Sequence, residues 1–530
     1  MFDCIVIGAG PGGLVCTKEL LEQDLGNVIC LEQAEDVGGV FANTYDSLRL
    51  TSSATMSMFS DFWIGDGNQH TFWTKKEAVE YWRRYAQHFG VLERIRFNSK
   101  AVAVALQESG DWQVQLASGE TLLSKRIALA IGNNAIPKYP AWKDSLTNVE
   151  YSHSKEYRNA DKFAGKNVLV VGGGESGSDL ALEASCVANN CWVSLRNSTG
   201  WVAPRKRSLQ KNDVATDVVL NRLVWGIPGT TFGKVVQQAE LGEKDPVHDA
   251  AVELNKKIKT RNGVWGTFGT KNFSLPKAIV HHGCKVVGEI VKVEDGGRTL
   301  HTANGESLQN VDAVIFSTGY KNYVSFLPEE LKENDPRSLY KHMFHPKYRD
   351  KIVWIGWARP SFGSQFPIME MQARLFATIC KGERTLPAPA EMERFTCMDR
   401  AFWLDRFEHN AHRIRSLVDY RRYMDDMAKE IGCEPPLWKY FFLHPRIWLS
   451  MVYSATQGIQ FRLRGPGNKE SLARELLMKL PVIIPTPIIK ASLKGVLEKG
   501  LKSFPVKKTN KQAERADFSI TRNSGIVKKT

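Results

Sequence analysis

The sequence predicts an α/β protein with two dinucleotide-binding Rossmann-like domains and a mainly helical C-terminal extension. Three observations support this fold class. A strand, a glycine-rich turn and a helix open the chain, the same pattern returns near residue 166, and the residues beyond 400 have mainly helical spacing. Short apolar strands that alternate with helices are typical of parallel sheets covered by helices.

The first nucleotide unit begins with the apolar run Cys4-Ile5-Val6-Ile7, which suits a buried strand. Gly8 permits a tight turn, Gly10 lets a pyrophosphate approach the backbone, and Gly13 lets the helix and strand pack closely. The start of the helix adds unpaired N–H groups and a partial positive charge for phosphates. We therefore expect cofactor contacts from Gly8, Ala9, Gly10, Pro11, Gly12 and Gly13.

A second apolar run, residues 28–31, ends in Glu32, whose carboxylate can accept both hydroxyls of an adenosine ribose. The strand, the helix and this acid distinguish the site from an ordinary glycine turn. Gly38 and Gly39 then allow the backbone to lie against a flat ligand, with an ordinary turn as the alternative. We expect Gly39, Val40 and Phe41 at the cofactor.

The polar, irregular stretch 45–53 is unlike a core element, and residues 59–62 follow it. We interpret this region as an active-site loop in which Thr51 and Ser52 are the candidate catalytic and cofactor-contacting residues. Residues 73–89 have helical periodicity, and residues 94–132 are typical of strands joined by turns.

The second nucleotide unit repeats the pattern with a strand at 167–171, a Gly-Gly-Gly-Glu-Ser-Gly turn at 172–177, and a strand that leads to Arg196. Counted along the chain, Arg196 follows Gly172 at the interval that separates Glu32 from Gly8, so the two units are expected to superpose without a gap. An acid at this position favours a plain ribose and a base favours a 2′-phosphate. The sequence thus predicts FAD in the first unit and NADPH in the second. The expected contacts are Gly172, Gly174, Ser176, Gly177, Ser194, Arg196, Asn197 and Arg205, although residues 205–207 could also be a solvated charge run.

Two later apolar strands end in small polar residues. The strand at 312–316 leads into Ser317-Thr318-Gly319, and the strand at 352–356 leads into a loop and a helix that carries Glu370 and Arg374. Because ligands bind at the carboxyl ends of parallel strands, we expect Ser317, Thr318, Gly319 and Gln365 at the cofactors. The alternative for Glu370 and Arg374 is a surface pair at i, i+4.

The order of these segments predicts a domain organisation. We expect an FAD-binding domain whose first part is 1–145 and whose second part is 311–400. An NADPH-binding domain at 146–310, with an insertion at about 208–280, separates the two parts. A helical region at 401–505 and a basic, disordered tail at 506–530 complete the expectation.

Composition excludes several classes of protein. Most of the net charge of +14 lies between residues 486 and 530, which hold 11 Lys/Arg against 3 Asp/Glu, so a nucleic-acid partner is not expected. No run of 18 uncharged apolar residues predicts a membrane span, and the first strand leaves no room for a signal peptide. Nine cysteines without metal-ligand spacing, Cys186 and Cys191 among them, fit free thiols in the cytoplasm. The basic amphipathic stretch 488–504 either packs on its own domain or contacts a membrane surface peripherally.

Together these motifs resemble the flavin-containing monooxygenase family, the class B flavoprotein monooxygenases. The motifs that carry the resemblance are residues 8–13, 38–41, 59–62, 172–177, 316–320, 418–420, 423–425 and 461–467. The resemblance implies that NADPH reduces FAD, that O2 forms a C4a-hydroperoxyflavin, and that one oxygen atom passes to a nitrogen or sulfur of a small organic substrate. Thr51 stands where the family usually has an asparagine.

Three alternatives remain open from the sequence. The first is a Baeyer–Villiger monooxygenase, which acts on a ketone, although Tyr157 stands where that class usually has tryptophan. The second is a flavoprotein that binds NADPH without oxygenating a substrate. The third is a peripheral membrane protein in which the basic tail is the main feature. No residue pattern identifies the substrate or the oligomeric state.

Overall fold

A computed structural model describes residues 1–65, 70–196, 198–209, 212–332 and 335–484, and Met1–Ile484 form one compact unit. The expected amphipathic stretch at 488–504 and the basic tail lie outside the described residues, as does Asn197. No helix within the described ranges is long and apolar enough to cross a membrane.

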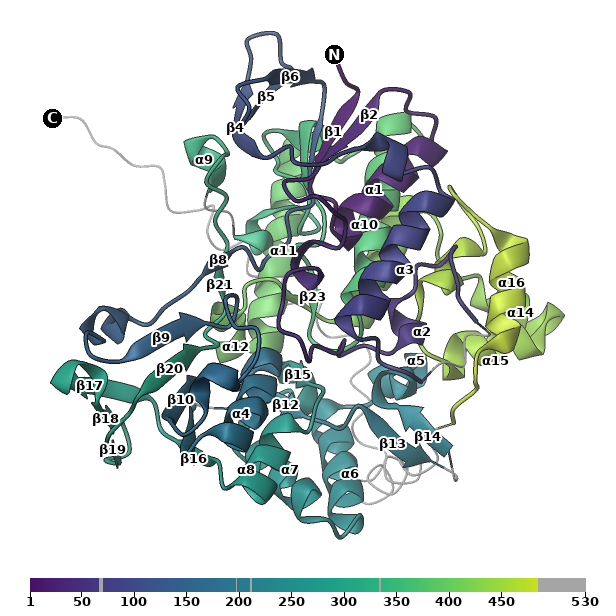
Figure 1. The fold of residues 1–530 in the computed structure, drawn as a ribbon. Coiled ribbons are helices and arrows are strands. Elements are labelled where there is room, and N and C mark those ends of the chain that lie inside the picture. The colour runs from purple at the N-terminus through teal and green to yellow at the C-terminus, as the bar shows by residue number, and fades with distance from the viewer. Residues whose placement is uncertain (66–69, 197, 210–211, 333–334, 485–530) are drawn as a thin grey trace, which may run out of the picture. The chain divides into compact units, whose positions relative to one another are not determined.

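The first sheet is parallel and has the strand order β22-β7-β1-β2-β3 (Figure 1). Its central strands are buried on both faces, which explains their continuous apolar runs. Helices α1 and α10 pack against each other beside it, so segments far apart in sequence share one layer. The elements of this half are β1 (Cys4–Ile7), α1 (Pro11–Glu22), β2 (Val28–Leu31), α2 (Ala54–Ser57), α3 (Lys75–His88), β3 (Ile95–Arg96), β4 (Ala101–Leu106), β5 (Trp112–Leu116), β6 (Thr121–Ser124), β7 (Ile127–Leu129), β22 (Ile352–Trp354) and α10 (Gln365–Lys381).

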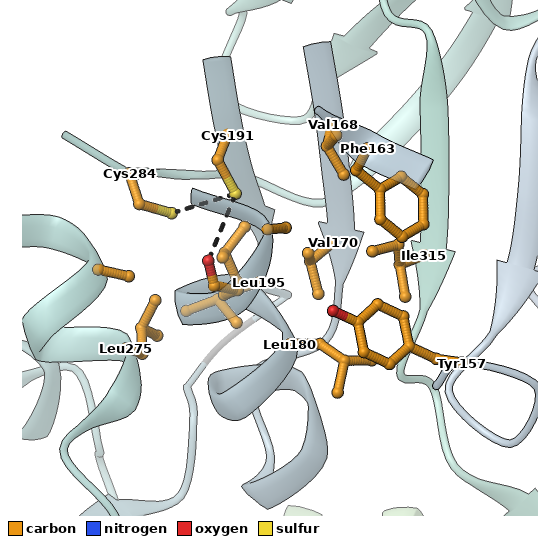
Figure 2. Packing of buried hydrophobic residues seen from close by; sticks show 14 of the residues in the cluster. Tyr157, Phe163, Val168, Val170, Leu180, Cys191, Leu195, Leu275, Cys284 and Ile315 are labelled. Atoms are coloured by element: carbon orange, nitrogen blue, oxygen red, sulfur yellow. Dashed lines mark hydrogen bonds between the residues drawn. The ribbon is translucent and has the colours of Figure 1, made fainter. Parts of the chain in front are cut away.

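The second sheet is also parallel, with the order β16-β11-β10-β20-β9. Its core is apolar: Val168, Val170 and Ile315 on the strands face Leu180 of the covering helix (Figure 2). Cys191 and Cys284 lie in this core with their sulfur atoms 3.8 Å apart as free thiols. The elements are β9 (Glu150–His153), β10 (Asn167–Val171), α4 (Glu175–Val187), β11 (Asn190–Ser194), α8 (Ser274–His282), β16 (Lys285–Val287) and β20 (Ala313–Phe316).

One expected boundary is wrong. Residues 311–316 were assigned to the first domain, but β20 pairs with β10 on one side and with β9 on the other. The chain therefore returns to the first sheet only after Phe316. Because β20 is apolar and ends in glycine, like a strand of either sheet, its residues alone could not decide which sheet it joins.

The insertion between the two parts of the second sheet is a hairpin followed by helices. Its first strands are β13 and β14, and its last strand, β15, pairs with β12 next to the second sheet. The elements are β12 (Trp201–Val202), β13 (Lys206–Leu209), β14 (Asn212–Ala215), α5 (Arg222–Trp225), α6 (Gly229–Gly242), α7 (Pro246–Lys256) and β15 (Gly269–Thr270).

Residues 389–484 form a mainly helical region, which contacts the first half through α13 and α10. Helix α14 leaves several large apolar side chains exposed, with Trp438 78% and Phe442 72% accessible. The helices are α11 (Pro389–Phe407), α12 (His409–Arg413), α13 (Tyr420–Ile431), α14 (Leu437–Leu443), α15 (Pro445–Tyr453) and α16 (Glu470–Lys479).

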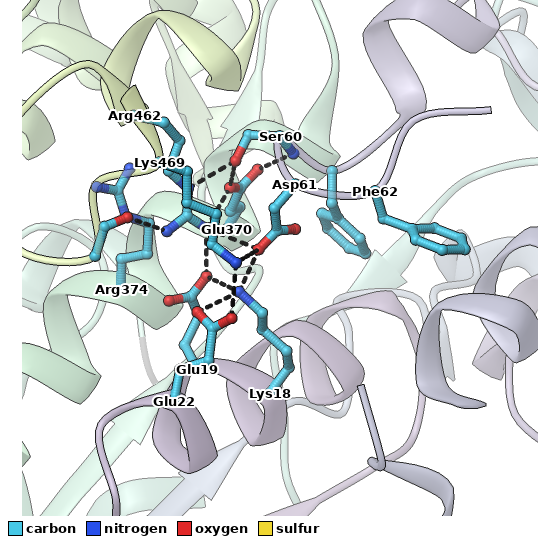
Figure 3. A network of polar contacts seen from close by, with 12 residues as sticks. Lys18, Glu19, Glu22, Ser60, Asp61, Phe62, Glu370, Arg374, Arg462 and Lys469 are labelled. Carbon is cyan, nitrogen blue, oxygen red and sulfur yellow. Dashed lines mark hydrogen bonds and ion pairs between the residues drawn. The ribbon is translucent and has the colours of Figure 1, made fainter. Parts of the chain in front are cut away.

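A buried network of charges connects this helical region to the first half (Figure 3). Arg462 is fully buried and donates to the carboxylates of Glu19 on α1 and Glu370 on α10, and to the Ser60 hydroxyl over 2.7 Å. Glu370 also accepts the Ser60 N–H over 2.9 Å. The alternative of a surface pair between Glu370 and Arg374 is therefore wrong, because both side chains are buried and bond to the 458–467 segment or to residue 60. The network holds four acids and four bases, namely Glu19, Glu22, Asp61, Glu370, Lys18, Arg374, Arg462 and Lys469.

Candidate nucleotide and active site

The first glycine turn has a shape that only glycine permits. Gly8 has φ +104°, and a Cβ placed on it would lie 2.7 Å from the Ala130 carbonyl oxygen. A Cβ on Gly13 would lie 1.7 Å from the Gly8 oxygen, so the strand and helix touch there. Pro11 begins α1, and Gly10 packs directly on Gly39. The turn, the helix start and the second glycine pair thus form one surface that fits a dinucleotide pyrophosphate.

Glu32 fixes this turn to the next strand. One carboxylate oxygen accepts the Ala9 N–H over 2.6 Å and the other accepts the Ala34 N–H over 2.9 Å. Each oxygen keeps a lone pair for a ribose hydroxyl. Val40 is exposed beside this surface, whereas Phe41 packs on Trp82 with ring centroids 5.0 Å apart. Glu32 and the neighbouring backbone therefore fit the adenosine end of FAD, and Phe41 packs against the protein behind this surface.

The predicted active-site loop is held from two sides. Ser52 is buried, and its hydroxyl lies 2.9 Å from that of Ser57 and 3.4 Å from that of Ser364 before α10. The Ser53 N–H donates to Asp217 of the insertion over 2.7 Å. Thr51 is half-buried next to them. Both halves of the molecule therefore determine the position of Thr51 and Ser52.

Gln365 is the first residue of α10, and its side chain donates to the Gly356 carbonyl over 2.6 Å. Gly356 follows β22, so Gln365 lies at the carboxyl edge of the first sheet, where ligands bind in such sheets. Asn133, which follows β7, donates to the same carbonyl over 3.3 Å. Gln365 therefore lies on the side of the first sheet where the sequence predicts the flavin.

Ser317, Thr318 and Gly319 belong to the second site. A Cβ on Gly172 would lie 2.5 Å from the Ser317 carbonyl oxygen. The Thr318 hydroxyl donates to the Lys138 carbonyl, and the Ser317 hydroxyl is buried without a partner among the described residues. Because β20 is a strand of the second sheet, Ser317 lies beside the second glycine turn, and its contact with a cofactor stays a prediction.

The second glycine turn repeats the geometry of the first. Gly172 also has φ +104°, and a Cβ on Gly177 would lie 2.0 Å from the Gly172 oxygen. No atom lies within 4 Å of a Cβ placed on Gly174, so its outer side is open. The turn at the start of α4 therefore fits a second pyrophosphate.

The strand register corrects the expected superposition by one residue. In the first sheet Ile7 pairs with Leu31, which places Gly8 next to Glu32; in the second, Val171 pairs with Ser194, which places Gly172 next to Leu195. Consistently, Leu195 lies against Gly173. In the second unit Leu195 therefore occupies the position that Glu32 occupies in the first, and Arg196 follows one residue later.

Arg196 is nevertheless placed for a phosphate. Its side chain is 62% exposed at the end of β11, and its closest described carboxylate is that of Glu289, at 3.9 Å. The Ser194 hydroxyl donates to the Gly288 carbonyl over 2.8 Å, which leaves it only as an acceptor. Arg205 lies 3.9 Å from Asp179 on α4 and has a buried Nε without a described partner. Ser176, on the first turn of α4, lies at the same end of the helix.

Two arginines that the sequence reasoning missed lie at the second site. Burial lowers the pKa of Arg413, and the charges of Arg196 and Arg359 lower it further. Burial also lowers the pKa of Arg359, against the opposing charge of Glu175, and its guanidinium has no hydrogen bond or ion pair among the described residues. The mutual repulsion of Arg196, Arg359 and Arg413 favours an anionic ligand near them. They come from three distant segments, so no spacing in the sequence could reveal them.

His153 has a structural role. Its Nε2 lies 3.1 Å from the Gly319 carbonyl oxygen, and its Nδ1 accepts the Lys155 N–H over 3.1 Å. Burial lowers the pKa of His153, so the ring is neutral and ties the end of β9 to the tip of β20.

Two glycine turns on two parallel sheets, one with an acid and one with a base at the strand end, define a protein of the two-dinucleotide oxidoreductase type. The family model described as "FMO-like: Flavin-binding monooxygenase-like" matches residues 3–504. The chain belongs to this family. It is a flavin-containing monooxygenase, an oxidoreductase with FAD and NADPH as cofactors.

Relatives extend over most of the chain. A "4-hydroxybenzoate brominase (decarboxylating)" of Pseudoalteromonas luteoviolacea is 32% identical and covers 91% of this chain and 94% of its own. "Flavin-containing monooxygenase 5" of Rattus norvegicus is 29% identical and covers 89% of this chain and 90% of its own.

Solved structures show the same fold at lower identity. S-allyl-L-cysteine S-oxygenase from Allium sativum superposes with a TM-score of 0.57 at 18% identity and covers 81% of this chain and 88% of its own. Cyclohexanone monooxygenase from Rhodococcus sp. Phi1, bound to NADP+, superposes with a TM-score of 0.58 at 17% identity. It covers 81% of this chain and 97% of its own. These likenesses confirm the expected fold class.

Proposed function

We propose that this enzyme uses NADPH and O2 to oxygenate a nitrogen or sulfur atom of a small organic substrate. The bound flavin would supply the chemistry, through a C4a-hydroperoxyflavin. One oxygen atom of O2 goes to the lone pair of the substrate, the other leaves as water, and NADPH provides the two electrons. The residues of the chain bind and orient the substrate and exclude water from the site.

The burial of the loop around Ser52 and Ser53 supports oxygenation over a mere sensing role. Ser52 is buried between α10 and the insertion, and Ser53 is fully inaccessible. A flavin that transfers oxygen needs a site closed to water, because open sites release H2O2. Thr51, beside this closed segment, is the candidate for a hydrogen bond to the flavin ring.

For the cofactors, we assign FAD to the surface formed by residues 8–13, Glu32 and residues 39–41. We assign NADPH to the turn at 172–177, with Arg196 as the partner of the 2′-phosphate. The fit of the two glycine turns and the converging cations support this division.

The test is a coupled assay on the purified holoenzyme with methyl p-tolyl sulfide and N,N-dimethylaniline. We expect sulfoxide or N-oxide to account for most of the NADPH consumed. If H2O2 accounts for all of it, and the NADPH-reduced enzyme reoxidises at once when mixed with O2, the oxygenase proposal fails in favour of the non-oxygenating alternative.

Two further substrate classes belong in the same assay. The Baeyer–Villiger alternative predicts ε-caprolactone from cyclohexanone. The 32% identical relative named as a brominase supports a second candidate, oxidation of bromide in the presence of a phenolic acid such as 4-hydroxybenzoate. Brominated phenol, formed only with bromide present, would favour that candidate.

For localisation we propose a cytoplasmic enzyme that contacts a membrane surface peripherally. The exposed side chains of Trp438, Phe442 and Leu443 on α14 support it, because clustered apolar side chains of this size are uncommon on a surface without a partner. Trp is typical of the interface between water and lipid.

A further inference from the structure

Lys271 is a buried cation without a direct counter-ion. Its side chain lies between the insertion and the loop before α10, with 7% of the residue exposed. Its ammonium group donates to the Gly363 carbonyl over 2.8 Å, and no described carboxylate oxygen lies within 4.0 Å of it. Buried charges are normally paired, so a lone one needs a reason.

The segment that carries Lys271 is fixed to the flavin half at several points. The Gly269 N–H donates to the Ser361 carbonyl over 2.8 Å, and the Trp265 ring packs on Phe362 with centroids 5.6 Å apart. The Lys271 N–H itself donates to the carboxylate of Glu175 at the start of α4 over 2.7 Å. The hydrogen bonds of the Gly269 and Lys271 N–H groups therefore fix the backbone that carries the Lys271 ammonium group.

This position is next to the residues assigned to the flavin. Gly363 lies two residues before Gln365, and Asp217, whose charge acts on Lys271, holds the N–H of Ser53 beside Ser52. Lys271 thus lies between the predicted ring site and the start of the second nucleotide helix.

The surrounding charges leave Lys271 only partly compensated. Burial lowers the pKa of Lys271; Asp217 and Glu175 oppose this effect, whereas Arg359 and Arg205 add to it. Asp217 already uses one oxygen for Ser53, and its other oxygen is buried without a described partner. The Asp217 carboxylate and the Lys271 ammonium group can therefore each form a further hydrogen bond to a bound ligand.

We infer that Lys271 binds an anionic group, a carboxylate, of the substrate, and that the enzyme acts on organic acids. This inference rests on the proposed function and deepens it. A carboxylate at Lys271 would supply the missing ion pair, and the loop at 361–365 would orient the rest of the molecule toward the flavin. Hydrogen bonds between charged groups at such a site are strong enough to dominate substrate choice.

Two matched substrates test the inference. 4-(Methylthio)benzoate and methyl p-tolyl sulfide present the same sulfur with and without a carboxylate. We expect wild-type enzyme to prefer the acid in kcat/KM, and Lys271→Met to reduce the ratio of acid to neutral sulfide about 10- to 100-fold. Lys271→Arg should restore part of the preference. Lys277→Met, at an exposed lysine on α8, is the matched control and should keep the wild-type ratio.

A binding measurement separates this inference from the oxygenase proposal. Equilibrium titration of the oxidised holoenzyme with benzoate and benzamide reads the anion site even if no oxygen is transferred. Selective binding of benzoate that Lys271→Met removes would support the site whether or not the sulfide assay succeeds.

Three results would overturn the inference. One is wild-type enzyme that binds benzoate and benzamide equally. Another is Lys271→Met with an unchanged ratio of acid to neutral sulfide. The third is a variant in which only the affinity for NADPH falls, measured from flavin reduction, since Lys271 would then bind a cofactor phosphate.

Discussion

The carboxylate of Asp217 accepts the backbone N–H of Ser53 over 2.7 Å, and both residues are buried. The bond joins the insertion to the loop that carries Thr51 and Ser52. Asp217→Ala removes a charge-assisted hydrogen bond of about 1.5–3 kcal/mol. The loop should then admit water, so the fraction of NADPH that ends as H2O2 should rise several-fold.

The measurement is the ratio of H2O2 formed to NADPH consumed, with substrate present. Asp249→Ala, at an exposed acid on α7, is the control and should keep the wild-type ratio. A wild-type ratio for Asp217→Ala would show that the insertion does not seal the site.

Arg196 should determine the preference for NADPH over NADH. Its exposed guanidinium lies two residues beyond the end of β11, where a 2′-phosphate is expected. Arg196→Ala should raise the dissociation constant of NADPH at least about tenfold and leave that of NADH nearly unchanged, as measured from the rate of flavin reduction. Equal losses for both nucleotides would contradict the assignment. Arg298→Ala, at an exposed ion pair of the same half, is the control.

The sequence was sufficient for the two nucleotide units because their signals are local. Strand, glycine turn and helix lie within about 30 residues, and each glycine has a steric reason that the structure confirms at Gly13 and Gly177. The one-residue offset between Glu32 and Arg196 could not be predicted, because pairing register depends on contacts across the sheet.

The rest of the site depends on contacts between distant segments. Arg359 and Arg413 reach the second site from the loop after β22 and from α12, and Lys271 reaches the flavin loop from the end of the insertion. Nothing in their local sequence distinguishes them from surface cations. The membership of β20 in the second sheet was missed for the same reason.

Gly13 should be essential for the flavin. A Cβ there would lie 1.7 Å from the Gly8 oxygen, far inside contact distance, so Gly13→Ala must separate the strand from α1. We expect protein that is purified without flavin, seen as loss of the yellow colour and visible absorbance of the oxidised flavin. Gly26→Ala, where nothing lies within 4 Å, should retain the flavin. A yellow Gly13→Ala protein would refute the role of this turn.

The exposed end of α14 should bind lipid. Trp438 and Phe442 are large apolar side chains that face solvent. We expect full-length protein to float with vesicles that contain anionic lipid, and the double variant Trp438→Ser with Phe442→Ser to float less, because burial of each side chain contributes about 1.5–3 kcal/mol. Met398→Ser, at an isolated exposed methionine, is the control. Equal flotation of the double variant and the wild type would exclude α14 as the contact.

Arg462 should determine stability in acid. Burial raises the pKa of Asp61, but the charges of Arg462, Lys18 and Lys469 outweigh it and hold the pKa well below the usual range; the pKa of Glu19 is lowered in the same way. A carboxyl whose folded pKa is depressed stabilises the fold above its unfolded pKa of about 4, and this contribution is lost as the pH falls through the folded value.

Arg462→Met leaves Glu19 and Glu370 buried without their main partner, which should cost about 3–5 kcal/mol at neutral pH. Without the guanidinium the carboxyls of Glu19 and Asp61 would protonate more readily, so the acid unfolding midpoint should move to higher pH. Thermal denaturation between about pH 3 and pH 8 measures both effects. Arg261→Met, at a surface ion pair, should change neither by more than about 1 kcal/mol. If both variants behave alike, the buried network does not hold the C-terminal helices on the flavin half.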